Sequence, residues 1–201
     1  MPRFNFEVPK LTKRKLFDIA SSSTIVHVGW MEGRWHEYAF GYQHAAELLV
    51  DRLINGRHVS PAAGLAVLYL YRHSVELSLK GMLQDAGDVL DQNELPSGRH
   101  PLKPLWAKLR TRMNEISSGN SEDWLDRAGE LIAELDSVDE GSFTFRYPVD
   151  KSGSTKLPSS HTVDIENFKS VMDELYLILD GCGAWLENYV DIARDMREAY
   201  Y

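Results

Sequence analysis

Four ionisable side chains interrupt an apolar stretch of this chain, residues 61–83, and they are the first candidates for chemistry. The stretch is otherwise rich in Ala, Val, Leu, Met and Tyr, a pattern that predicts a helix buried on nearly all sides. Arg72, Glu76 and Lys80 recur at every fourth position and His73 precedes Glu76 by three, so all four lie on one flank of that helix. Charges enter a core helix only when they are paired, hydrogen-bonded or facing a cleft.

Two further local patterns carry groups that suit phosphate chemistry. His100 stands just before Pro101, at the predicted start of a helix, where an anion is favoured and an imidazole can donate or accept a proton. Arg146 and Tyr147 precede a proline on a predicted strand, and arginine suits planar, two-pronged recognition of a phosphate or carboxylate.

Each of these residues also has a structural interpretation. Arg72, Glu76 and Lys80 could form a salt-bridge ladder along the helix. His73 could be a hydrogen-bonded core histidine, and His100 could be a helix cap. The remaining candidate, Arg146, could pair with a carboxylate of the bundle and hold its own segment in place. The sequence leaves both sets of interpretations open.

Other catalytic templates do not fit. There is no glycine-rich phosphate loop, no metal-type cysteine pair, no His-Glu-x-x-His and no Gly-x-Ser-x-Gly, so neither a metal nor a cofactor is expected. The apolar surroundings of the single cysteine, Cys182, favour a packed thiol over a nucleophile. The acidic group Asp136, Asp139 and Glu140 is typical of a solvated helix end.

Composition sets the class of protein. The 201 residues are enough for one sizeable core, and we expect one domain over residues 1–201. The net charge of -8 argues against general, charge-driven binding of nucleic acid but leaves room for a local basic cleft. Absence of a disulfide pair, of a signal-like segment and of a long apolar run predicts a cytoplasmic protein without membrane contact.

Periodicity predicts an all-α, antiparallel bundle of about five helices. The expected helices span about residues 35–55, 61–87, 100–116, 122–138 and 163–197. An extended arm is expected over residues 1–30. Residues 141–161 are expected to form a small β-hairpin insertion before the long last helix, because Ser142 to Tyr147 alternates in polarity and a turn-like stretch follows. Gly181 and Gly183, in the middle of that last helix, would cost stability unless another backbone packs closely there.

Three motifs together resemble HEPN-type proteins, which are all-α domains found in bacterial toxin–antitoxin and defence systems. They are Tyr-Arg-His-x-x-Glu-Leu-x-Leu-Lys at residues 71–80, His-x-Leu-x-x-Leu-Trp at residues 100–106, and Phe-Arg-Tyr-Pro-x-Asp at residues 145–150. The resemblance covers about residues 35–195. It implies a homodimer, an antitoxin or defence-system partner and, in active members, metal-independent cleavage of RNA at the dimer interface.

The family's cleavage motif, Arg-x(4–6)-His, is only partly matched. Arg146 is followed by no histidine within seven residues, whereas Arg52 and His58 have the right spacing at a predicted helix end. If the protein is a ribonuclease, Arg72 and Arg146 would hold phosphate. Either His73 or His100 would then act as general acid or base.

The supporting roles complete this hypothesis: Glu76 would orient the histidine, while Lys80 and Tyr147 would add contacts to the substrate. The alternative is an inactive HEPN-like interaction and dimerisation module, in which the same residues form a buried polar network. A second alternative is a sensor of a nucleotide or another small ligand.

Overall fold

The structure, a computed structural model, describes residues 25–26, 34–56, 60–92, 100–117, 123–139, 141–149, 152–155, 157 and 162–199. The chain divides into two compact units, Met1–Glu32 and Gly33–Tyr201. Residues 25 and 26 are the part of the first unit that is described, so the arm predicted over residues 1–30 lies outside the described residues. The second unit is the helical body.

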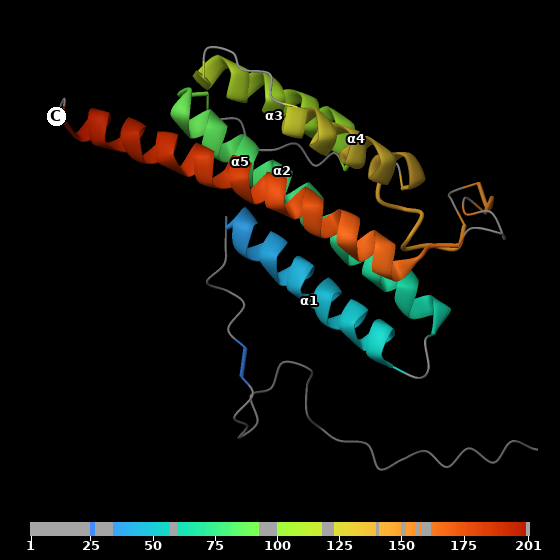
Figure 1. The fold of residues 1–201 in the computed structure, drawn as a ribbon. Coiled ribbons are helices and arrows are strands. Elements are labelled where there is room, and N and C mark those ends of the chain that lie inside the picture. The colour runs from blue at the N-terminus through green and yellow to red at the C-terminus, as the bar shows by residue number, and fades with distance from the viewer. Residues whose placement is uncertain are drawn as a thin grey trace, which may run out of the picture. The chain divides into compact units, whose positions relative to one another are not determined.

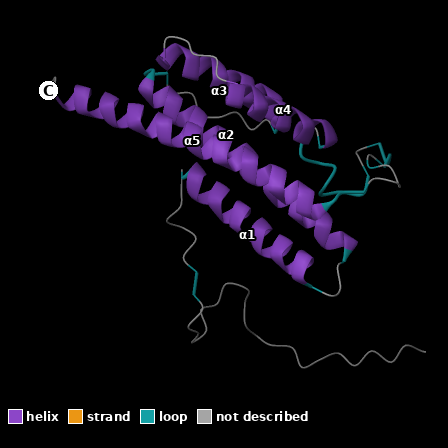
Figure 2. Cartoon of the chain, viewed as in Figure 1, coloured by secondary structure: helices purple, strands orange, loops and turns teal. Residues whose placement is uncertain are grey.

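Five α-helices make up the helical body in its described part (Figures 1 and 2). They are α1 (Trp35–Asn55), α2 (Pro61–Val89), α3 (Leu102–Ser117), α4 (Asp123–Val138) and α5 (Ile165–Ala199). The all-α prediction and the five helix positions are confirmed to within a few residues at each end.

Helix α2 is the central element, since α1, α3 and α5 all pack against it. Figure 1 shows α5 running beside α2, with α1 on one side of this pair and α3 and α4 on the other. The core between them is built of apolar side chains, among them Val50, Leu79, Leu109, Ile132 and Leu186. Because three helices cover α2, the helix has little solvent-exposed surface and can carry apolar residues on nearly all sides.

The predicted β-hairpin is wrong: residues 141–149, 152–155 and 157 contain no strand (Figure 2). The segment turns instead, with the amides of Arg146 and Tyr147 donating to the Phe143 carbonyl at 3.2 and 3.0 Å. Side chains do not alternate either, because Thr144 and Phe145 are both buried. Six alternating residues are too few to specify a strand when the backbone finds closer partners.

Two smaller findings complete the fold. Within the described residues, no helix is both long enough and apolar enough to cross a membrane. No other described backbone packs closely at Gly181 or Gly183, since a Cβ atom at either position would meet nothing within 4 Å.

Candidate functional site

The charged flank of α2 is buried and internally paired. Arg72 is 0 % exposed and Glu76 1 %, and Lys80 is buried beside them. Arg72 donates from Nη1 to Glu76 Oε2 at 3.1 Å, and Lys80 donates from Nζ to Glu76 Oε1 at 2.7 Å. The four-residue spacing seen in the sequence therefore produces a ladder on one face of the helix.

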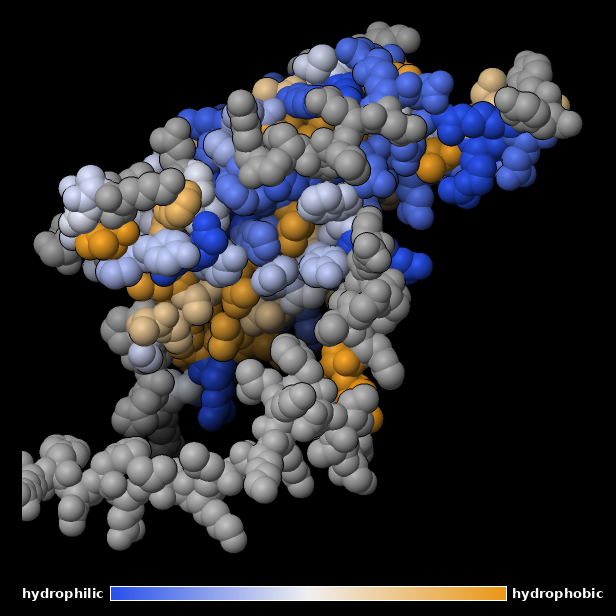
Figure 3. Space-filling model, turned by 180° about the vertical axis from the view of Figure 1, so that it is seen from behind, coloured by the Kyte–Doolittle hydropathy of each residue, from blue (hydrophilic) through white to orange (hydrophobic). Residues whose placement is uncertain are grey.

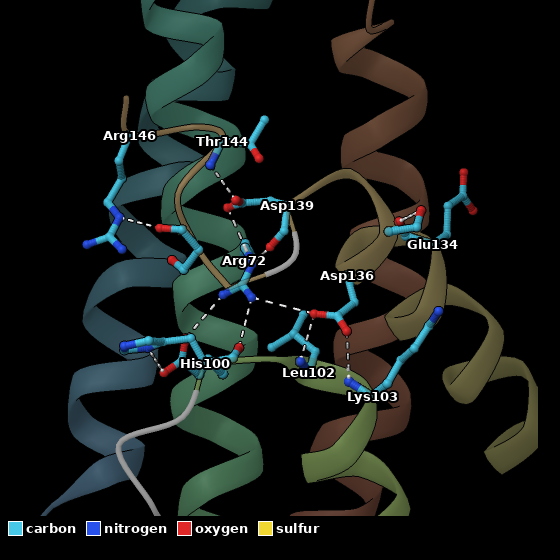
Figure 4. Close-up of polar contacts among 12 residues, drawn as sticks. Arg72, His100, Leu102, Lys103, Glu134, Asp136, Asp139, Thr144 and Arg146 are labelled. Carbon is cyan, nitrogen blue, oxygen red and sulfur yellow. Dashed lines mark hydrogen bonds and ion pairs between the residues drawn. The ribbon is translucent and has the colours of Figure 1, made fainter. Parts of the chain in front are cut away.

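Arg72 is the junction of this ladder with two distant segments (Figure 4). Its Nε donates to the Asp139 carbonyl at 3.0 Å, and its Nη2 donates to the His100 carbonyl at 2.8 Å. The carboxylates of Asp136 and Asp139 lie 3.6 and 3.4 Å from the guanidinium. A phosphate has no path to a side chain so enclosed, so the predicted phosphate-binding role does not fit the position of Arg72.

Asp136 and Asp139 are structural residues of this arrangement, not the solvated helix end that the sequence suggested. Asp136 accepts the amides of Leu102 and Lys103 at 2.8 and 3.3 Å and so caps the start of α3 from the neighbouring helix α4. Asp139 accepts the Thr144 amide at 2.6 Å and fixes the segment that follows α4.

A sequence signal for this burial existed. Asp139 falls four residues after Leu135 and seven after Ile132, on the apolar stripe of α4. We call Arg72, Glu76, Lys80, Asp136 and Asp139 the buried ion network.

His100 connects the buried ion network to solvent. Its Nδ1 lies 3.0 Å from Glu76 Oε1, and 46 % of its side chain is exposed. Burial alone would raise the pKa of Glu76, but hydrogen bonds from Lys80 and His100 outweigh it and the pKa is lowered. An ionised carboxylate that is held from several sides orients the imidazole and leaves its other nitrogen, Nε2, available for proton transfer.

His73 lies in an aromatic environment and makes no ion pair with Glu76. Its ring stacks on Tyr69 at 5.5 Å between centroids and meets the ring of Tyr42 edge-on at 4.5 Å. Burial lowers the pKa of His73, and the charges of Glu76, Lys80 and Arg146 act on it in both directions. The imidazole is therefore neutral at pH 7, which suits a proton acceptor and not a donor.

Arg146 is exposed and rests on three aromatic rings. The guanidinium carbon lies 5.6 Å from the Tyr69 ring, 5.2 Å from Phe143 and 5.6 Å from Tyr147, and Nε donates to the Ser142 carbonyl. Because Tyr69 contacts both Arg146 and His73, the two residues belong to one aromatic cluster.

The structure thus separates six of the seven predicted site residues into two groups, while the seventh, His73, is half-buried in the aromatic cluster. Arg72, Glu76 and Lys80 are buried and bonded to protein, whereas the accessible polar groups are His100, Arg146 and Tyr147. In the view of Figure 4, Arg146 and His100 lie on the same side of Arg72. Of the two residues that match the Arg-x(4–6)-His spacing, Arg52 lies at an exposed position of α1 and His58 lies outside the described residues.

Two observations concern metal ligands and the thiol in the described part of the chain. No group of three His, Cys, Asp or Glu side chains there is arranged to hold a metal ion. Cys182 is buried, and burial raises the pKa of its thiol to about 12. Comparison of the chain with protein-family models, with curated proteins and with solved structures finds no match.

Proposed function

We propose that this protein is a HEPN-like ribonuclease that cleaves RNA without a metal, with His100 as its acid–base group. The observation that carries the proposal is the pairing of the half-exposed His100 with the buried, ionised Glu76. Such a carboxylate–histidine pair fixes the imidazole and stabilises its protonated form when a proton arrives. The resemblance of the three motifs to HEPN proteins supplies RNA as the substrate and a toxin–antitoxin or defence system as the setting.

The reaction follows from the accessible groups. Arg146 would bind the scissile phosphate through its outer guanidinium edge, and Tyr147 would offer its exposed ring to a neighbouring base. His100 would take the proton of the 2′-hydroxyl, whose oxygen then attacks the adjacent phosphorus. The imidazolium would return the proton to the departing 5′-oxygen, and a 2′,3′-cyclic phosphate would remain. The buried ion network would position His100 without touching the substrate.

The test is cleavage of labelled total RNA and tRNA in the presence of EDTA. Wild-type protein is compared with His100→Gln and Arg146→Ala, and with His36→Gln as a matched control, because His36 also pairs a half-exposed imidazole with a carboxylate, that of Asp85. Loss of general acid–base catalysis predicts a rate at least about 100-fold lower for His100→Gln, with the control unchanged. Equal cleavage by wild type and His100→Gln would refute the assigned role.

A homodimer is part of this proposal, and the outer side of α1 offers a surface for it. Phe40 is 65 % exposed and Leu48 58 %, and the two lie eight residues apart on one side of the helix, with Gly41 and His44 between them. Figure 3 shows apolar surface gathered low on the helical body when it is viewed from behind. Exposed apolar side chains at this spacing fit the packing of a second copy of the helix.

The second candidate function is a non-catalytic interaction module. The complete enclosure of Arg72 favours it, because a side chain bonded to three segments fixes bundle geometry whether or not chemistry follows. The same cleavage assay separates the two: a folded protein that leaves RNA intact in EDTA and in Mg²⁺ supports the module. Cleavage that His100→Gln abolishes supports the enzyme.

A further inference from the structure

A pocket of about 440 Å³ lies apart from the buried ion network, between α4 and α5. Leu68 of α2 and Phe145 of the segment after α4 also line it. Pockets that hold small molecules have volumes of about 300–1,000 Å³, so this one has room for a ligand of modest size.

The walls of the pocket are mostly apolar. Leu131 comes from α4, while Phe168 and Met172 come from successive turns of α5. Further Leu and Val side chains contribute, and Thr162 and Asn167 are the uncharged polar residues of the lining. The apolar majority of this lining gains free energy by covering an apolar or aromatic body. The interior therefore selects for an apolar ligand body.

The charged residues that line the pocket, which we call its rim, determine which charge a ligand can carry at its polar end. Arg127 is the positive group there, but Glu174 holds it from Nε and Nη2 at 3.1 and 3.2 Å, and Glu130 lies at 3.4 Å. Two carboxylates, those of Glu134 and Asp164, line the same pocket. With the arginine neutralised by its own partners, the rim is acidic overall.

The start of α5 also faces this rim, and it is already capped. Asp164 accepts the amides of Glu166 and Asn167 at 3.0 and 3.1 Å, so its carboxylate occupies the place where an anion would bind. An anionic ligand such as a fatty acid would meet the capped helix start and the carboxylate of Glu134. A cationic ligand would instead find the carboxylate oxygens of Glu134 as hydrogen-bond acceptors.

We propose that this pocket binds a small molecule with an apolar or aromatic body and an ammonium or similar cationic head. The body would lie between α4 and α5, and the head would pair with Glu134 at the rim. The inference is independent of RNA cleavage, since none of the residues proposed for cleavage lines the pocket.

The experiment is a fluorescence titration of the full chain with dansylcadaverine, an aromatic body carrying a primary ammonium. The anionic dye 1-anilinonaphthalene-8-sulfonate serves as the charge comparison. Val171→Trp fills the pocket from a half-buried position of α5, and Glu134→Gln removes the rim charge from an exposed position. Glu115→Gln, on the exposed side of α3, is the control for loss of one carboxylate.

We expect one dansylcadaverine per chain, bound more tightly than the anionic dye. Affinity should fall at least about tenfold in Val171→Trp and about threefold in Glu134→Gln, with Glu115→Gln unchanged. Circular dichroism and urea unfolding confirm that each variant is folded. Unchanged affinity in both pocket variants, or tighter binding of the anionic dye, would overturn the proposal. The exposed Glu134 keeps this test valid if Val171→Trp fails to fold.

Discussion

Glu76 carries contacts to three basic side chains on two carboxylate oxygens, at almost no exposure to water. Two of the three partners come from its own helix, and the third, His100, comes from the residues before α3. A carboxylate with this many donors remains ionised at neutral pH and fixes the positions of the groups around it.

Removal of this carboxylate should destabilise the whole fold. Glu76→Ala leaves Arg72 and Lys80 buried without their shared partner, and an uncompensated buried charge costs about 3–5 kcal/mol. The free energy of unfolding, measured with urea, should fall by that amount. Glu37→Ala, at an exposed position of α1, is the control and should change it by less than about 0.5 kcal/mol. Equal stability of Glu76→Ala and wild type would show that the ladder is not a structural element.

The lowered pKa of Glu76 also predicts how stability depends on pH. The unfolded chain takes up the proton first, near the ordinary value of 4.5, while the folded chain resists it. The stabilisation from the ionised carboxylate is therefore fully present above pH 4.5 and is lost as the pH falls through the folded-state pKa. Urea unfolding of wild type and Glu76→Gln at pH 7, 5 and 3.5 should show the difference in stability shrinking only below about pH 4.5. A constant difference would contradict the shift.

Single-residue roles were predictable where the partners lie on one helix. The spacing of Arg72, Glu76 and Lys80 predicts the ladder directly, since helix geometry places residues four apart next to each other. The contributions of Asp136 and Asp139 depend on where α4 packs, 60 or more residues along the chain, and local spacing holds no information about that. Local spacing likewise did not indicate the neighbours of Arg146: it was interpreted as a partner of a bundle carboxylate, and in the described part of the chain it contacts three aromatic rings.

At the scale of elements, the helices follow from periodicity because each one presents an apolar stripe to a shared core. The conformation of the short segment 141–149 does not follow from periodicity, because it is set by hydrogen bonds between particular side chains and its backbone groups. The Thr144 amide is taken by Asp139, and the Ser142 carbonyl is taken by Arg146. Backbone amides and carbonyls that are bonded to side chains in this way cannot also form the hydrogen bonds between two strands.

Two helix glycines should respond oppositely to alanine. A Cβ atom on Gly129 of α4 would lie 2.9 Å from Nε1 of the buried Trp106 of α3, so Gly129→Ala must displace a packed indole and should cost about 1–3 kcal/mol. Gly181 of α5 has open space around its Cα, so Gly181→Ala should gain about 0.5–1 kcal/mol from helix propensity. Thermal and urea unfolding measure both. A stabilising Gly129→Ala would show that α3 and α4 are less tightly packed than described.

At the scale of the whole molecule, the exposed apolar side of α1 predicts self-association. Light scattering after gel filtration should give twice the 22.9 kDa mass of one chain for the wild type. Leu48→Glu should shift the protein to the monomer, because a carboxylate cannot be buried there without a partner. Leu177→Glu, an exposed leucine of α5, is the matched control and should leave the mass unchanged. A monomeric wild type at high concentration would exclude the proposed interface.

The enclosure of Arg72 also determines the order in which the chain can fold. Its partners at His100 and Asp139 lie 28 and 67 residues further along, so a nascent chain that has completed α1 and α2 lacks two of the segments that cover and bond this arginine. Until those segments are in place, the charged face of α2 lacks the partners that allow it to be buried, and the α1–α2 pair lacks much of its core. Folding is therefore cooperative across most of the helical body, and a fragment that ends before α4 will be a substrate for proteases rather than a working half of the protein.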